Sequence, residues 1–235
     1  MAEADILIIT AASIAFLHTV LGPDHYLVFT AMGKARDWTL AKTLRITLYC
    51  GIGHVLGSVL LGAIGILIGA ELARLVTIEG VRGSLAGWAL LAFGLIYLVW
   101  GLRKAARSRA HSHLHAHDGV VHAHEHDHYG EHTHVHDQTA QKSITPWALF
   151  IVFVLGPCEA LIPLFMYPAA QNSGGLVVTV ALVFGIVTLA TMLLGVAVTY
   201  LGIEKLRLPS PGRYVHAVAG ASIVVCASAI TFLGL

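Results

Sequence analysis

Six long apolar stretches alternate with polar connections along this chain, and they set the expected fold. Each stretch has at least 21 residues, which is enough to cross about 30 Å of hydrocarbon as an α-helix. The stretches lack the alternation of barrel strands, and open sheets cannot satisfy their backbone polar groups in lipid. We therefore predict an all-α integral membrane protein with six transmembrane helices, at residues 6–32, 43–70, 81–102, 144–167, 176–202 and 215–235.

A long polar segment divides these helices into two groups of three. The predicted units are residues 1–102, the connecting loop 103–143 and residues 144–235. Because three is an odd number of crossings, the second group would lie inverted with respect to the first. We thus expect two inverted three-helix repeats.

A repeated tripeptide supports this division. Leu-Gly-Pro at residues 21–23 returns 134 residues later at residues 155–157, inside the first and fourth apolar stretches. Proline lacks a backbone donor and frees carbonyls in the preceding turn, so both helices should break there. The breaks are at Gly22, Pro23, Gly156 and Pro157. At the same spacing, residues 51–52 match residues 185–186, and His54 falls opposite Thr188; one residue shorter, residues 86–87 match 219–220.

Composition and charge agree with a membrane protein and suggest its orientation. Only 11% of the residues are charged and 57% are hydrophobic, whereas about a quarter are charged in soluble domains. Of the 14 Lys and Arg residues, 12 lie in or beside the first, third and fifth connections, and cytoplasmic loops carry such an excess. We expect a multi-pass protein of the cell's inner (cytoplasmic) membrane, with both termini outside and loop 103–143 in the cytoplasm. The first segment is acidic at its start and should be retained rather than cleaved. No nucleic-acid partner is indicated, and a homo-oligomer stays open.

Ionisable side chains within the apolar stretches are the candidate functional residues, because such groups are costly in a membrane and mark ion pathways. Asp24 and Glu159 are the acidic residues that this reading places well inside those stretches, each just after a break. Imidazole nitrogens combined with carboxylates suit Zn, Ni, Co, Fe or Cu better than Mg or Ca. The alternative is that these groups only hydrogen-bond one another, and Cys158 could equally be a small packing residue. The candidate metal ligands are His18, Asp24, His25, His54, Cys158 and Glu159.

The connecting loop contains a second set of histidines. Between residues 111 and 136 there are 11 histidines in 26 residues, interspersed with acidic side chains. Such tracts bind metals with modest selectivity and cannot form a packed core, so we expect disorder without metal. The loop ligands are His111, His113, His115, His117, His122, His124, His126, His128, His132, His134 and His136.

These motifs together resemble the nickel/cobalt transporter families, within the wider lysine-exporter-type superfamily. The resemblance rests on His18-x5-Asp24-His25 in the first span, on His54 in the second and on the histidine-rich loop. The families have a similar H-x4-D-H signature, from which this chain departs by one residue. The resemblance implies six helices in two inverted halves, with His18, Asp24 and His25 as the residues that select the metal.

The predicted function is secondary transport of a divalent transition-metal cation, with Ni2+ or Co2+ favoured and Zn2+ or Fe2+ possible. The metal is cargo, and we expect neither a permanent cofactor nor an enzymatic activity. Protons are the expected coupling ion because His and carboxylate ligands shed protons when they bind metal. The cytoplasmic loop slightly favours export over import. The alternatives are a metal-binding accessory or sensor protein and, less favoured, a thiol-redox membrane protein, which would need a second sulfur.

Overall fold

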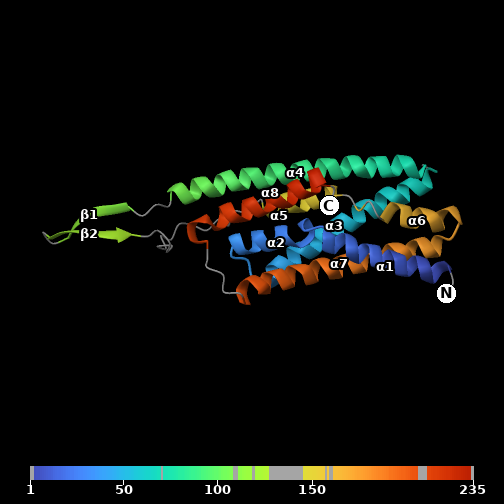
Figure 1. The fold of residues 1–235 in the computed structure, drawn as a ribbon, viewed down its shortest axis with the longest axis horizontal. Coiled ribbons are helices and arrows are strands. Elements are labelled where there is room, and N and C mark those ends of the chain that lie inside the picture. The colour runs from blue at the N-terminus through green and yellow to red at the C-terminus, as the bar shows by residue number, and fades with distance from the viewer. Residues whose placement is uncertain are drawn as a thin grey trace.

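Eight α-helices surround the candidate residues in the part of the chain that the structure describes. The structure is a computed structural model that describes residues 3–69, 71–107, 111–117, 120–126, 145–156, 158, 161–205 and 211–233. The helices are α1 (Glu3–Leu21), α2 (Asp24–Ala35), α3 (Leu40–Leu67), α4 (Leu72–Arg107), α5 (Thr145–Leu155), α6 (Leu161–Ala170), α7 (Gly174–Lys205) and α8 (Val215–Leu233), with a 3-10 turn (Gly212–Tyr214) before α8. Figure 1 shows them side by side in an elongated bundle.

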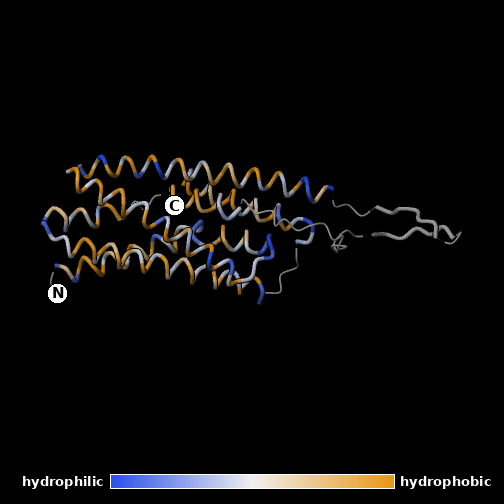
Figure 2. Tube along the Cα trace, turned by 180° about the vertical axis from the view of Figure 1, so that it is seen from behind, coloured by the Kyte–Doolittle hydropathy of each residue, from blue (hydrophilic) through white to orange (hydrophobic). Residues whose placement is uncertain are grey.

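Five of these helices are long and apolar enough to cross a membrane. They are α1, α3, α4, α7 and α8 with its preceding 3-10 turn. Figure 2 shows apolar residues along most of the bundle and hydrophilic residues mainly toward its ends. Many of the large apolar side chains face outward, including Leu67, Ile96 and Ile186. A bundle with such a surface is a membrane protein, because water would not tolerate so much exposed apolar area.

The predicted helix breaks occur where Gly-Pro stands in the sequence. The helix α1 ends at Leu21 and α2 begins at Asp24, just after Pro23. In the second half, α5 ends at Leu155 and α6 begins at Leu161, while Pro157 lies outside the described residues. The two helices of each pair follow one another along the bundle (Figure 1). We call residues 22–23 the first break and residues 156–160 the second break.

The helix α4 begins earlier than the hydropathy pattern indicates, and this corrects one sequence-based conclusion. The predicted span started at residue 81, yet α4 starts at Leu72 and therefore includes Glu79 in addition to Arg82. Glu79 is buried, with 1% of its side chain exposed, so Asp24 and Glu159 are not the only candidate acidic groups inside the bundle. Arg82, three residues later, pairs with Glu79 at 2.7 Å. The two opposite charges cancel, so this pair can lie within an apolar helix, where separate charges would not be tolerated.

Glycines bring α3 and α7 into close contact in a reciprocal way. A Cβ atom added to Gly51 would lie 2.7 Å from Cδ2 of Leu189, and one added to Gly185 would lie 3.1 Å from Cγ1 of Val55. Leu189 lies four residues after Gly185, and Val55 lies four residues after Gly51. Each glycine therefore contacts the corresponding residue of the other helix, and small residues at such contacts let membrane helices approach closely.

The contact between α4 and α8 has the same reciprocal form. A Cβ atom at Gly87 would lie 2.9 Å from Oγ1 of Thr231, and one at Gly220 would lie 2.5 Å from the backbone nitrogen of Leu98. Leu98 and Thr231 each lie eleven residues after the glycine of their own helix. The sequence matches at residues 86–87 and 219–220 thus correspond to equivalent positions in one helix contact.

Basic and aromatic residues gather at one end of the bundle. This end contains the connection from α2 to α3, the ends of α4 and α7, and the starts of α5 and α8 (Figure 1). Trp100 and Trp147 are exposed there, as is typical of aromatic residues at a membrane interface. The interactions that join these segments are Lys34 with Glu204 at 2.7 Å, Arg36 with Thr145 at 2.8 Å and Lys104 with His216 at 3.0 Å.

Part of the histidine-rich tract forms a hairpin, where the sequence predicts disorder. The strands β1 (His111–His117) and β2 (Val120–His126) pair antiparallel, with His111 opposite His126 and His113 opposite His124. Two antiparallel strands can satisfy each other's backbone donors and acceptors without a packed core. The histidines at residues 128–136 lie outside the described residues.

The close contact at Gly220 leads to a stability prediction. In Gly220→Ala, the new methyl group would meet backbone atoms of Leu98 at 2.5 and 2.6 Å, which cannot rotate away. We expect a loss of about 1–3 kcal/mol in the free energy of unfolding, as overpacking usually costs. Thermal unfolding of the purified protein in detergent measures this. Gly80→Ala in α4 is the control, because no atom lies within 4 Å of its added Cβ and its stability should be unchanged or slightly higher. Equal stability of both variants would contradict the prediction.

Candidate metal centre

Three buried or partly buried histidines meet beside the first break. His18 is in the last turn of α1, His25 is the second residue of α2, and His54 lies near the middle of α3. One ligand nitrogen from each ring lies within 4.8 Å of the others. The ring centroids of His18 and His25 are 5.0 Å apart, and those of His25 and His54 are 5.3 Å apart. We call these three residues the histidine cluster.

The break itself orients His25. Its Nδ1 lies 3.1 Å from the carbonyl oxygen of Gly22 and 3.1 Å from Oδ1 of Asp24. Both oxygens only accept hydrogen bonds, so Nδ1 must be the nitrogen that carries the proton. In the neutral ring, Nε2 then has the free lone pair that a metal needs.

The second half of the chain orients His54 in the same way. Its Nδ1 donates to the carbonyl oxygen of Phe153 in α5 at 3.3 Å. In an intact helix that carbonyl would accept from the residue four positions later, which is Pro157 and has no N–H. The backbone N–H of Gly156 donates to this carbonyl at 3.1 Å, and the second lone pair of the carbonyl accepts from His54. The second break therefore provides the group that fixes this ring.

One nitrogen of each ring is available to bind an ion. The Nε2 atoms of His18, His25 and His54 are buried, and none has a hydrogen-bond partner among the described residues. Unsatisfied buried nitrogens are costly, and three of them together suit a set of metal ligands. Tetrahedral sites with metal–nitrogen bonds of about 2.1 Å place ligand nitrogens about 3.4 Å apart, so small ring rotations would close the cluster on an ion.

Asp24 lies beside the cluster but is not one of its converging groups. Its carboxylate contacts the Nδ1 side of His25, and the described groups with suitably placed ligand atoms are the three histidines. Its side chain is 23% exposed, whereas that of His25 is 5% exposed. A carboxylate on the far nitrogen of a ligating imidazole fixes the ring and raises its basicity. This geometry favours a supporting role for Asp24, where the sequence analysis predicts a direct ligand.

Of the other predicted ligands, the structure describes Cys158, which lies outside the cluster. Cys158 is fully buried in an apolar core cluster with Leu161 and Phe184, and its backbone nitrogen donates to Oγ of Ser58 at 3.1 Å. This environment suits a packing cysteine. Glu159 lies outside the described residues, so its prediction as a ligand is unchanged. The side chains of the loop histidines also lie outside what the structure describes.

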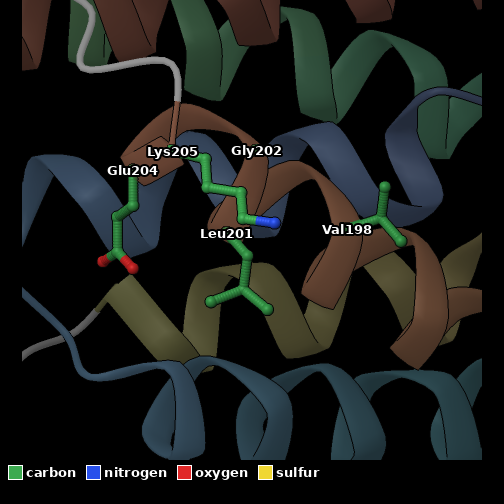
Figure 3. Close-up of a pocket in the computed structure, with 5 residues that line it drawn as sticks. All are labelled: Val198, Leu201, Gly202, Glu204 and Lys205. Carbon is green, nitrogen blue, oxygen red and sulfur yellow. The ribbon is translucent and has the colours of Figure 1, made fainter.

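A hollow at the end of α7 offers a different environment. Its lining residues are Val198, Leu201, Gly202, Glu204 and Lys205. Figure 3 shows the carboxylate of Glu204 and the ammonium group of Lys205 pointing away from each other. The carboxylate is already paired with Lys34 at 2.7 Å. This hollow lacks a converging set of ligands and is not the candidate centre.

Two groups beside the centre are missed by the sequence analysis. The first is the carbonyl of Phe153, for which only the proline four residues later gives a signal. The second is the Glu79–Arg82 pair, whose Arg82 donates to the carbonyl oxygens of Val154 and Gly156. Two opposite charges spaced three residues apart next to an apolar stretch could have indicated a helix that continues through them.

Comparisons with known proteins do not assign the chain to a family. No protein-family model, curated protein or solved structure matches it.

The geometry leads to a prediction that separates a ligand from a supporting group. We consider the full-length protein with its 11 loop histidines replaced by serine, so that the loop does not bind metal. Asp24→Asn should retain binding of one divalent ion per chain with an affinity about 10–100-fold lower, as loss of a supporting carboxylate usually costs. His25→Ala removes a ligand and should lower the affinity by far more than that, because only two imidazoles remain to bind the ion weakly. Competition titrations against a chelator measure both. If Asp24→Asn loses binding as completely as His25→Ala, Asp24 is itself a ligand.

Proposed function

We propose that this protein is a secondary transporter of divalent transition-metal cations. The observation that carries the proposal is the histidine cluster, three converging imidazoles with unpartnered Nε2 atoms among helices of membrane-spanning character. Ionisable residues at such positions mark ion pathways, and imidazole ligands select Ni, Co, Zn, Fe or Cu over Mg or Ca. The metal is the cargo, and no permanent cofactor is needed.

We also propose that the bundle consists of two inverted repeats with six spans. In this arrangement α1 with α2, and α5 with α6, are the two broken spans. The reciprocal contacts of Gly51 with Leu189 and of Gly185 with Val55 support a pseudo-two-fold relation between the halves. Many transporters are built from such repeats, with the substrate site at helices interrupted near the membrane midplane. The histidine cluster lies beside one such interruption and depends on the other through Phe153.

The resemblance of the His18-x5-Asp24-His25 motif to nickel/cobalt transporters favours Ni2+ or Co2+ as the cargo, with Zn2+ and Fe2+ as further candidates. Protons are the proposed coupling ion because the ligands must lose protons to bind metal and can regain them on release. Export is slightly favoured, since the histidine-rich tract would collect metal on the cytoplasmic side.

The accessory or sensor alternative places metal binding in the loop and gives the bundle only an anchoring role. The histidine cluster argues against it, because a simple anchor has no use for three buried imidazoles with free nitrogens. A thiol-redox function is less favoured still. It needs a second sulfur at the breaks, and the first break has Asp24 where the second has Cys158.

The transport proposal predicts the effect of removing one ligand. In proteoliposomes with an imposed pH gradient, His25→Ala and His54→Ala should each abolish flux of Ni2+ or Co2+. His216→Gln is the matched control, because His216 contacts Tyr97 and Lys104 at the end of the bundle and not the cluster. It should transport at the normal rate. Normal flux in both cluster variants would overturn the site assignment.

Replacing the loop histidines separates transport from the sensor alternative. With the 11 histidines of residues 111–136 changed to serine, the transport proposal predicts that flux persists with altered affinity or regulation. Complete loss of flux in this variant, with the bundle still folded, would favour the loop as the functional element.

The proposed orientation places the end with Lys34, Arg36 and Lys104 in the cytoplasm, following the excess of basic residues there. A protease site inserted within residues 127–136 should then be cleaved in inside-out membrane vesicles and protected in intact spheroplasts. Immunoblotting of the fragments measures this. Cleavage in spheroplasts alone would reverse the assigned orientation.

A further inference from the structure

A buried ion pair lies next to the candidate metal centre, in a position that the transport proposal does not use. Glu79 and Arg82 of α4 are 1% and 18% exposed, and their Oε1 and Nη1 atoms are 2.7 Å apart. Taking two charges out of water is expensive, and their attraction repays the cost only with additional hydrogen bonds. The question is what this pair holds in place.

Arg82 holds the end of α5. Its Nη2 donates to the carbonyl oxygens of Val154 at 3.1 Å and of Gly156 at 3.0 Å. In a continuous helix the Val154 carbonyl would accept from the backbone nitrogen of Cys158, but that nitrogen donates to Ser58 instead. Arg82 thus supplies the Val154 carbonyl with the hydrogen bond that the second break removes.

The carbonyl of Phe153 lies in the peptide unit directly before Val154. This carbonyl accepts the Nδ1 proton of His54 and so determines where Nε2 points. A rotation of the last turn of α5 would move the Phe153 carbonyl together with those that Arg82 holds. Hydrogen bonds and the backbone of α5 together therefore connect Glu79, through Arg82, to His54.

Gly57 shows how closely α3 approaches this connection. A Cβ atom at Gly57 would lie 2.9 Å from Nη2 of Arg82 and 3.1 Å from the carbonyl oxygen of Val154. Gly57 is three residues after His54 on the same helix. The segment of α3 that carries His54 therefore lies directly against the guanidinium group of Arg82, because Gly57 has no side chain to separate them.

We infer that Arg82, held by Glu79, is a positioning residue for His54 and so for the metal affinity and preference of the histidine cluster. The inference rests on the proposed metal-binding function. Arg82 does not touch the metal; it fixes the α5 carbonyl that orients one ligand. Through this connection, α4 and α5 control a ligand that belongs to α3.

The test uses the full-length protein with the loop histidines changed to serine, and competition titrations with Ni2+ and Zn2+. The variant combines Glu79→Gln with Arg82→Met, because replacing both members of a buried pair avoids the unpaired charge that a single change would leave. We expect an affinity about 10-fold lower and a changed ratio of Ni2+ to Zn2+ affinity, as for other groups that orient ligands. Arg74→Gln, at an exposed position earlier in α4, is the matched control and should bind as the parent does.

A second background distinguishes positioning from a general loss of structure. In His54→Ala, the double change should cost no further affinity, because the ligand through which Arg82 acts is gone. An equal fold-loss in the parent and in His54→Ala would overturn the inference, as would unchanged affinity and preference in the parent. Gly57→Ala, which leaves both charges in place, should alter the same preference if the double variant does not fold. Failure of the parent itself to bind metal through His25 would instead refute the proposed function.

Discussion

The backbone carbonyls at the two helix breaks, which lack their regular hydrogen bonds from four residues later, are the constraint on which the rest of this structure depends. In a membrane interior, such groups must find donors within the protein, because no water replaces them. At the first break, the carbonyl of Gly22 accepts from Nδ1 of His25. At the second break, the carbonyl of Phe153 accepts from Nδ1 of His54, and those of Val154 and Gly156 accept from Arg82. Each imidazole that satisfies a carbonyl through Nδ1 is left with Nε2 pointing elsewhere. The same hydrogen bonds that repair the breaks therefore orient two of the three candidate ligands.

This arrangement requires helices that approach one another closely. Lipid tails are as apolar as the helix surfaces, so the approach depends on small residues and hydrogen bonds rather than on a hydrophobic driving force. Gly51 and Gly185 serve this purpose between α3 and α7, and Gly87 and Gly220 between α4 and α8. The position of His54 opposite α5 follows from the same close packing, since Gly53 of α3 would contact Phe150 and Val154 if it had a Cβ atom. Close packing at the glycines and hydrogen bonding by the carbonyls therefore act together to place the candidate ligands.

The sequence was sufficient for the features that depend on composition and on proline. Apolar length predicted the five long helices apart from the start of α4, Gly-Pro located the breaks, and the three histidines within the spans are the ones that converge. It was not sufficient where a role depends on which atom faces which. Nothing in the residue types indicates that Asp24 lies on the Nδ1 side of His25, or that a backbone carbonyl at Phe153 orients a ring 99 positions away in the chain. Hydropathy scores each residue separately and so places Glu79 outside the span. In the helix, however, Glu79 is paired with Arg82, and the pair is neutral.

The charges around the proposed site favour a carrier over a permanent metal store. Three neutral imidazoles contribute no charge, and a divalent ion would bring two positive charges into an apolar interior. Asp24 offers one negative charge next to His25, while Glu79 and Arg82 compensate each other. Among the described residues, this leaves one positive charge, unlike in closed structural sites where thiolates neutralise the metal. For the proposed transport function, we infer that this remaining charge lets the ion leave after its ligands have selected it, since conduction through a membrane protein requires both.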